Sequence, residues 1–213
     1  MDKSAQLNQR INRLVHATDP VETQAVYKEW AATYNDDLEN FGYLAPKIGA
    51  NLFREAFPQH DGLILDAGCG TGLVGKALTD LGYSNFHGVD FSPDMLATAA
   101  QSGHYARLME ASFLQPAFLE VWGIADETYD AAICIGVYQS CMKETLIPEL
   151  IRCIRPGGVL CLSARLHYVE DELDEQLKDY EKAGILKIEL AIQQIYMQAQ
   201  NADAFYFVLQ KID

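Results

Sequence analysis

The sequence has no apolar run near the ~20 residues that a membrane-spanning helix requires. Its first residues, from Met1 to Gln6, are mostly polar and contain no apolar segment typical of a secretory signal. We therefore expect a cytoplasmic protein with no membrane contact. With 213 residues, of which 49% are hydrophobic and 22% charged, the chain can form one domain with an ordinary core.

Basic residues are few, because 16 Lys and Arg are outnumbered by 30 Asp and Glu, for a net charge of −14. Binding to a polyphosphate backbone needs a basic surface, and the sequence has no cluster of five or more Lys or Arg. We therefore expect no nucleic-acid substrate, unless a separate partner supplies such a surface. The five cysteines form no C-x-x-C pair, so we expect neither a metal site nor a disulfide framework.

Three glycines at alternate positions follow the apolar run 63–67, in the order Gly68, Gly70 and Gly72. Glycine lets the backbone turn sharply and approach a ligand without a Cβ atom between them. The spacing G-x-G-x-G departs from the dinucleotide-binding G-x-G-x-x-G, because Leu73 occupies the place of the last glycine. The sequence also lacks G-x-x-x-x-G-K-[ST], which excludes a P-loop.

A second apolar run, residues 86–90, ends in the carboxylate of Asp90, 18 residues after Gly72. An acid about 20 residues after a glycine-rich turn typically binds ribose hydroxyls. Ser92, directly before Pro93, fits the N-cap of the next helix and so leaves Asp90 for a ligand. The two motifs together predict a pocket for an adenosine-type cofactor.

The run Asp66-Ala67-Gly68-Cys69-Gly70-Thr71-Gly72 resembles, residue for residue, the first motif of the class I S-adenosylmethionine-dependent methyltransferases. The stretch from Val26 to Pro46 resembles the opening of the methyltransferase-like group named for the Williams–Beuren syndrome chromosome region. The resemblance implies S-adenosyl-L-methionine as cofactor and S-adenosyl-L-homocysteine as product. It also implies a methyltransferase activity.

From Leu63 onward, short apolar runs alternate with amphipathic helices, which indicates a parallel sheet covered on both faces. The expected strands are 63–67, 86–90, 106–110, 129–135, 158–164, 185–192 and 203–210, and the expected helices 72–82, 93–102, 143–154 and 169–183. The last two strands have no crossover helix between them and should pair antiparallel. The resemblance implies an α/β, Rossmann-like, seven-stranded sheet of order 3-2-1-4-5-7-6.

We expect residues 1–60 to form a helical cap or lid over a cofactor-binding domain of residues 61–213. Asp19 and Pro20 predict the start of a helix, and a second one should run over residues 46–57.

Tyr27, Trp30 and Tyr34 should lie on one face of the first of these helices, because they are three or four residues apart. Such a face is more often core than ligand site. The resemblance implies instead that it closes over the cofactor.

Ligands bind at the carboxyl ends of the strands in an open sheet of this kind. The candidate cofactor-binding residues are therefore the aromatic residues of the first helix and the residues that follow strands one to four. They are Tyr27, Trp30, Tyr34, Asp66, Ala67, Gly68, Cys69, Gly70, Thr71, Gly72, Asp90, Phe91, Met95, Ser112, Phe113, Ile135, Gly136 and Val137. Met95 could equally be core, and Ser112 occupies the place where the resemblance implies an aspartate that binds adenine.

Methyl transfer depends mainly on alignment of the reacting groups, with at most a positioned base. Tyr138 and His167 are the candidates for that base, although His167 could equally be a surface residue. The runs typical of DNA methyltransferases are absent, since no proline lies between Pro116 and Pro148.

We expect a small molecule as acceptor first and a protein second. Two alternatives stay open: a catalytically silent cofactor-binding or interaction module with this fold, and a nicotinamide-dependent reductase. The sequence does not determine the oligomeric state.

Overall fold

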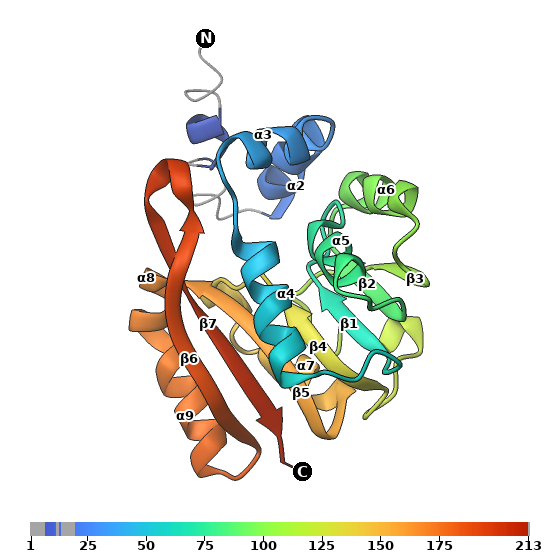
Figure 1. Cartoon of the computed structure of the whole chain (residues 1–213), viewed down its shortest axis with the longest axis vertical. Coiled ribbons are helices and arrows are strands. Elements are labelled where there is room, and N and C mark those ends of the chain that lie inside the picture. Colours follow the sequence, from blue (N-terminus) through green and yellow to red (C-terminus); the bar gives the residue numbers. More distant parts are fainter. Residues whose placement is uncertain (1–6, 12, 14–19, 213) are drawn as a thin grey trace.

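The computed structural model describes residues 7–11, 13 and 20–212, which form a central sheet with helices around it (Figure 1). The strands are β1 (Ile64–Ala67), β2 (Phe86–Asp90), β3 (Arg107–Glu110), β4 (Tyr129–Cys134), β5 (Ile154–Arg165), β6 (Leu186–Met197) and β7 (Ala202–Lys211). Their order is β3-β2-β1-β4-β5-β7-β6, with β1 to β5 parallel and β7 antiparallel to both neighbours. The predicted fold and strand order are confirmed.

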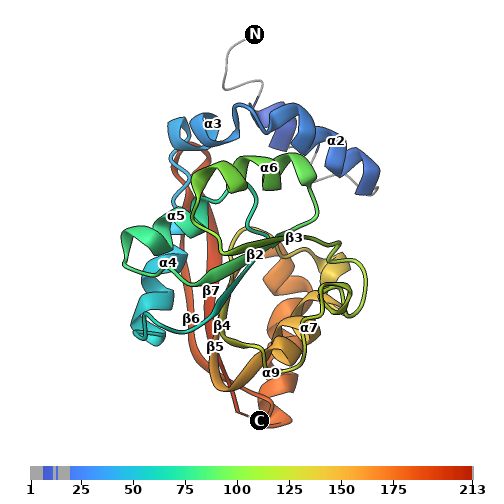
Figure 2. The ribbon, with the colours of Figure 1, turned by 90° about the vertical axis from the view of Figure 1, so that its right-hand side faces the viewer.

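Helices cover both faces of this sheet (Figure 2). They are α2 (Pro20–Trp30), α3 (Tyr34–Asn40), α4 (Ala45–Ala56), α5 (Leu73–Asp80), α6 (Pro93–Ser102), α7 (Leu146–Cys153), α8 (Leu166–Tyr168) and α9 (Asp174–Lys182). Short 3-10 turns lie at Glu120–Trp122, Ser140–Met142 and Gln198–Gln200, and a π-helical turn lies at Val169–Leu173.

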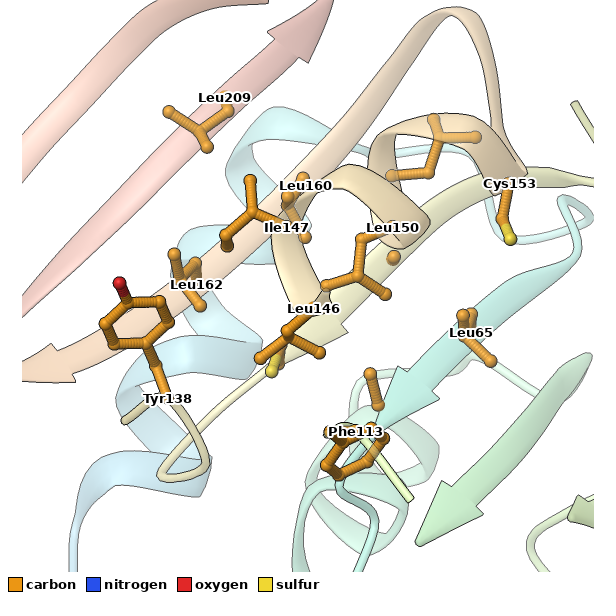
Figure 3. Close-up of a cluster of buried hydrophobic side chains, with 14 of the residues drawn as sticks. Leu65, Phe113, Tyr138, Leu146, Ile147, Leu150, Cys153, Leu160, Leu162 and Leu209 are labelled. Carbon is orange, nitrogen blue, oxygen red and sulfur yellow. The ribbon is translucent and has the colours of Figure 1, made fainter. Parts of the chain in front are cut away.

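The core has two parts, one on each face, because successive strand residues point to opposite sides. On one face, Phe53 of α4 and Leu78 of α5 pack with Ile64 of β1. On the other, Leu146, Ile147 and Leu150 of α7 pack against Leu160 and Leu162 of β5 (Figure 3). Whereas α4 packs on one face of the sheet, α2 and α3 lie beyond the end of the sheet (Figure 1).

The first helix differs from its prediction, because it ends at Trp30 and a separate helix begins at Tyr34. The carboxylate of Asp37 accepts hydrogen bonds from the Trp30 indole N–H (2.9 Å) and the Thr33 hydroxyl (3.0 Å), which holds this turn. The prediction of one continuous helical face is therefore wrong. Asp19, the expected N-cap, lies outside the described residues.

The remaining differences concern element ends. β5, β6 and β7 are each longer than predicted, and α9 begins at Asp174 because the π-helical turn Val169–Leu173 precedes it. Within the described part of the chain, no helix has the length and apolar character needed to cross a membrane.

Candidate functional site

The glycine loop and Asp90 come together because β1 and β2 are neighbours and end side by side, with Ala67 opposite Val89. Asp90 Oδ2 accepts a hydrogen bond of 2.9 Å from the Gly70 backbone N–H, and Oδ1 accepts one of 2.9 Å from Ser92 N–H. Ser92 Oγ in turn accepts from Met95 N–H, which confirms its predicted role as N-cap of α6. Asp90 is therefore fixed at the carboxyl edge of the sheet.

The charge of Asp90 is set by two opposing effects. Burial raises its pKa to about 6, although backbone N–H groups of Ser92, Gly70 and Phe91 favour the ionised form. At pH 7 the group is thus mostly ionised. A carboxylate offers about four acceptor positions, so these backbone N–H groups do not fill all of them, and Asp90 can still accept from a ribose hydroxyl.

A cavity of about 150 Å³ lies in front of Asp90, and we call it the Asp90 cavity. Gly70 lines it with φ +52°, and a Cβ atom built on Gly70 would meet no heavy atom within 4 Å. The loop therefore presents bare backbone to this space. Residues from several other segments complete the wall: Thr23, Tyr27, Tyr34, Tyr43, Gly68, Phe91, Met95, Ser112, Phe113, Leu114, Ile135, Gly136, Val137, Gln139, Cys141 and Met142.

The structure brings together twelve of the predicted cofactor-binding residues as lining of the Asp90 cavity. These are Tyr27, Tyr34, Gly68, Gly70, Asp90, Phe91, Met95, Ser112, Phe113, Ile135, Gly136 and Val137. Six others do not line it: Trp30, Asp66, Ala67, Cys69, Thr71 and Gly72. Among the latter, Thr71 donates its hydroxyl hydrogen to Asn35 Oδ1 of α3 (2.5 Å) and so joins the glycine loop to the N-terminal helices.

Asp66 lies beneath the glycine loop rather than in the cavity. It follows Leu65 in β1 and so faces the same side as Ile64, where the Tyr105 hydroxyl donates a hydrogen bond of 2.7 Å to Oδ2. Its other oxygen, Oδ1, is buried and has no partner among the described residues. Burial raises the pKa of Asp66 to about 7, with a smaller contribution from the nearby charge of Asp90.

A second cavity, of about 90 Å³, adjoins the first, and we call it the Arg165 cavity. Six residues line both: Tyr27, Tyr34, Tyr43, Gly136, Val137 and Gln139. The others are Ile11, Trp30, Leu38, Tyr138, Ser163, Ala164, Arg165, Tyr168, Tyr196 and Met197. The sequence analysis missed Arg165, although it is the last residue of β5 and the rule of carboxyl strand ends could have identified it.

Two tyrosines missed by the sequence analysis border the junction of the cavities. Tyr43 Oη donates a hydrogen bond of 3.2 Å to Tyr196 Oη, and their rings meet edge to face with centroids 5.0 Å apart. Gly136, at φ +79°, makes room for them, since a Cβ atom there would lie 2.4 Å from Tyr43 Oη. Burial raises the pKa of Tyr43 well above its ordinary value, so its hydroxyl stays protonated.

The two candidate bases occupy different positions. Tyr138 lines the Arg165 cavity, and burial raises its pKa to about 12, so the phenol is neutral at pH 7. Its hydroxyl is buried without a hydrogen-bond partner among the described residues. His167 is exposed, lies with its ring centroid 3.9 Å from that of Tyr168, and lines neither cavity. The structure therefore does not bring His167 to the site.

Comparison with known proteins agrees with this geometry. Residues 64–158 match the model of a family described as methyltransferase domain. Methyltransferase-like protein 27 of Homo sapiens is 36% identical over 167 residues, which cover 75% of this chain and 66% of that protein. The chain spans just under two thirds of that relative and 33–51% of the other curated relatives it matches.

Solved structures share the fold at lower identity. A TehB-like methyltransferase from Corynebacterium glutamicum has a TM-score of 0.65 at 20% identity, over 88% of this chain and 98% of that one. The 1,6-didemethyltoxoflavin-N1-methyltransferase of Burkholderia thailandensis, solved with S-adenosylhomocysteine, has a TM-score of 0.64 at 16% identity, over 92% of each chain. The finer resemblance to the Williams–Beuren group is untested and stays a prediction. The chain belongs to the class I S-adenosylmethionine-dependent methyltransferases.

Proposed function

We propose that this protein transfers a methyl group from S-adenosylmethionine to a small-molecule acceptor bound in the Arg165 cavity. One observation carries the proposal: the two cavities adjoin at the carboxyl edge of the sheet and share six lining residues. A donor held by Asp90 and an acceptor near Arg165 would therefore meet at Gly136, Tyr43 and Tyr196. Such a placement supplies the alignment on which methyl transfer depends.

The residues of the Asp90 cavity suit the cofactor of the family. Asp90 offers free acceptor positions for ribose hydroxyls, Gly70 leaves its Cβ space open, and Met95 and Phe113 offer apolar contacts for a base. When bound, S-adenosylmethionine supplies a methyl group on a sulfonium that is already activated. Tyr27 of α2 and Tyr34 of α3 also line this cavity of about 150 Å³, so a bound cofactor would contact the N-terminal helices.

The residues of the chain itself position the reacting groups and exclude water. They do not remove a proton from the acceptor. Among the described residues, no Asp, Glu or His lines the Arg165 cavity. Three of its tyrosines, Tyr27, Tyr34 and Tyr43, are protonated, because burial raises the pKa of each. We therefore propose that the acceptor atom arrives in its nucleophilic form. Tyr138 fits better as a wall of this cavity than as a base.

A small molecule is favoured as acceptor by size and charge. The Arg165 cavity is small, and α2 and α3 contribute Tyr27, Trp30 and Tyr34 to its wall. The net charge of −14 disfavours a polyphosphate partner. The fold relative from Burkholderia thailandensis was solved with 1,6-didemethyltoxoflavin bound, which is in keeping with such a substrate.

The test is turnover with methyl-labelled S-adenosylmethionine and a cell extract split into small-molecule and protein fractions. We expect S-adenosylhomocysteine to form with the small-molecule fraction and the label to appear in a small product. Asp90→Asn should abolish this, whereas Asp94→Asn, which changes a carboxylate outside the cavity, should not. Cofactor binding without turnover in either fraction would identify a catalytically silent module. Labelled protein would contradict the small-molecule acceptor.

A further inference from the structure

Arg165 occupies an unusual place for a cation in this chain. It is the last residue of β5, half-buried, at the edge where the parallel strands end, and its side chain lines the second cavity. The guanidinium carbon lies 5.4 Å from the centroid of the Tyr196 ring, a distance at which a cation is attracted to the ring face. The stacking fixes the guanidinium beside the junction of the two cavities.

Among the described residues, no carboxylate forms an ion pair with this cation. Four other arginines form salt bridges: Arg10 with Asp37, Arg13 with Glu29, Arg152 with Glu149 and Asp126, and Arg155 with Asp130. Within residues 7–11, 13 and 20–212, the side chain of Arg165 makes neither a salt bridge nor a hydrogen bond, although its backbone pairs with Ala204 of β7. With 30 acidic and 16 basic residues in the chain, acidic partners are plentiful, so an unpaired arginine in a cavity wall is notable.

The rest of the cavity wall offers hydrogen-bond donors and no negative charge. Tyrosines 27, 34, 43, 168 and 196 line it, and none of the described lining residues is an Asp or Glu. The positive charge of Arg165 lowers the pKa of Tyr27, Tyr34 and Tyr168, although burial outweighs it in each case. The phenols of Tyr27, Tyr34 and Tyr168 therefore remain donors. A guanidinium together with neutral hydroxyls is the donor set that binds a carboxylate or similar oxyanion.

We infer that the methyl acceptor carries a carboxylate or another small oxyanion, and that Arg165 binds it. The inference rests on the proposed function and names the chemical class of its substrate. The Arg165 cavity, of about 90 Å³, is the smaller of the two and has room for a small oxyanion. The remainder of the acceptor would extend toward the junction at Gly136, where the Asp90 cavity begins.

The experiment uses the full chain saturated with S-adenosylhomocysteine and titrated with acetate, succinate and benzoate. Acetamide, succinamide and benzamide serve as neutral counterparts of the same shape, and inorganic phosphate tests the other oxyanion. We expect the acids to raise the melting temperature and the amides to have no effect. Arg165→Gln should weaken acid binding by about 10- to 100-fold, the range for hydrogen bonds to a charged group.

The matched control is Arg54→Gln, since Arg54 is an exposed arginine of α4 that lines neither cavity. Both variants should bind S-adenosylhomocysteine like the wild type, and Arg54→Gln should also keep acid binding. A phosphate response equal to that of the acids and lost with Arg165→Gln would assign the site to phosphate-bearing acceptors. Amides that bind as well as acids, or acid binding unchanged in Arg165→Gln, would overturn the inference.

Binding of S-adenosylhomocysteine is measured separately from binding of the acids. If S-adenosylhomocysteine did not bind to the wild type, the proposed function would be wrong. The same acids titrated onto the ligand-free protein, with the same two variants, would then decide whether Arg165 binds an oxyanion. If the acids raise the melting temperature of the wild type but not of Arg165→Gln, the oxyanion site is supported. If the acids have no effect on the wild type, the inference is overturned.

Discussion

The carboxylate of Asp90 accepts the backbone N–H of Gly70 at 2.9 Å, across the ends of two neighbouring parallel strands. The bond ties the carboxylate expected to bind ribose to the glycine loop expected to approach the cofactor. It also keeps a buried carboxylate at the cavity wall without a basic side chain to neutralise it. The charge of Asp90 should consequently respond to what occupies the cavity.

We predict that affinity for S-adenosylhomocysteine rises with pH. Burial holds the pKa of Asp90 at about 6 in the ligand-free protein. Ribose hydroxyls donate to the ionised form, so binding should lower that pKa and release a proton. Affinity should increase from about pH 5 to about pH 7 and then level off. Calorimetry in two buffers of different ionisation enthalpy measures the proton, and Asp90→Asn should remove the pH dependence.

We predict that the stability of the ligand-free protein falls as pH rises, because burial also raises the pKa of a second carboxylate, Asp66. The pKa of Asp66, about 7, lies above its ordinary value of 3.8, so the folded state retains a proton that the unfolded chain releases. Its contribution to stability is full below about pH 4 and is lost as pH rises through about 7. Denaturant unfolding of the wild type and Asp66→Asn across this range measures the difference. A difference that did not change with pH would contradict the prediction.

Gly136→Ala should strain the backbone and, in addition, displace the tyrosines that border the two cavities. The new Cβ atom would lie 2.4 Å from Tyr43 Oη and 3.0 Å from Tyr196 Oη, so the two tyrosines would have to separate. Gly157→Ala is a matched control, because Gly157 has the same φ of +79° and no heavy atom within 4 Å of such a Cβ.

Both variants should lose ~1–2 kcal/mol of stability from the left-handed backbone, but only Gly136→Ala should also weaken S-adenosylhomocysteine binding. Unfolding curves and calorimetry on the two variants make the comparison. Equal ligand affinity in both would show that the tyrosine pair does not border the ligand site.

Much of this fold could be predicted from the sequence, because the relevant signals are local. Apolar runs alternate with amphipathic helices, and the glycine spacing and Asp90 each follow a strand. The break between Trp30 and Tyr34 was not predictable in this way. It depends on a side-chain bond to Asp37, which helical periodicity does not reveal.

Part of the site, likewise, could be predicted from the sequence and part could not. Residues that follow β1, β2 and β4 were identified because their motifs occur next to strand ends. Asp66 is in the motif but faces the other side of β1, toward Tyr105. Arg165 ends β5 and could have been identified by the same rule, but only the structure shows that it lines a cavity without a salt-bridge partner among the described residues.

The N-terminal helices should become more protected when ligand binds. Tyr27 of α2 and Tyr34 of α3 line the Asp90 cavity, so a ligand bound there would contact both helices and hold them in place. Hydrogen exchange over residues 27–43 should therefore slow markedly with S-adenosylhomocysteine, while β4 (Tyr129–Cys134), in the middle of the sheet, should change little. Protection of 27–43 that is already complete without ligand would make this segment part of the fixed core.

The most direct test of the account is calorimetric titration of the wild type with S-adenosylhomocysteine, beside Asp90→Ala, Gly70→Val and Gly103→Val. We predict binding in the micromolar range, roughly −8 kcal/mol, weakened by ~1.5–3 kcal/mol in Asp90→Ala. Gly70→Val should abolish it by filling the cavity, whereas Gly103→Val, also at positive φ and in open space, should keep it. Absence of heat at millimolar ligand, or full affinity in Gly70→Val, would contradict the account.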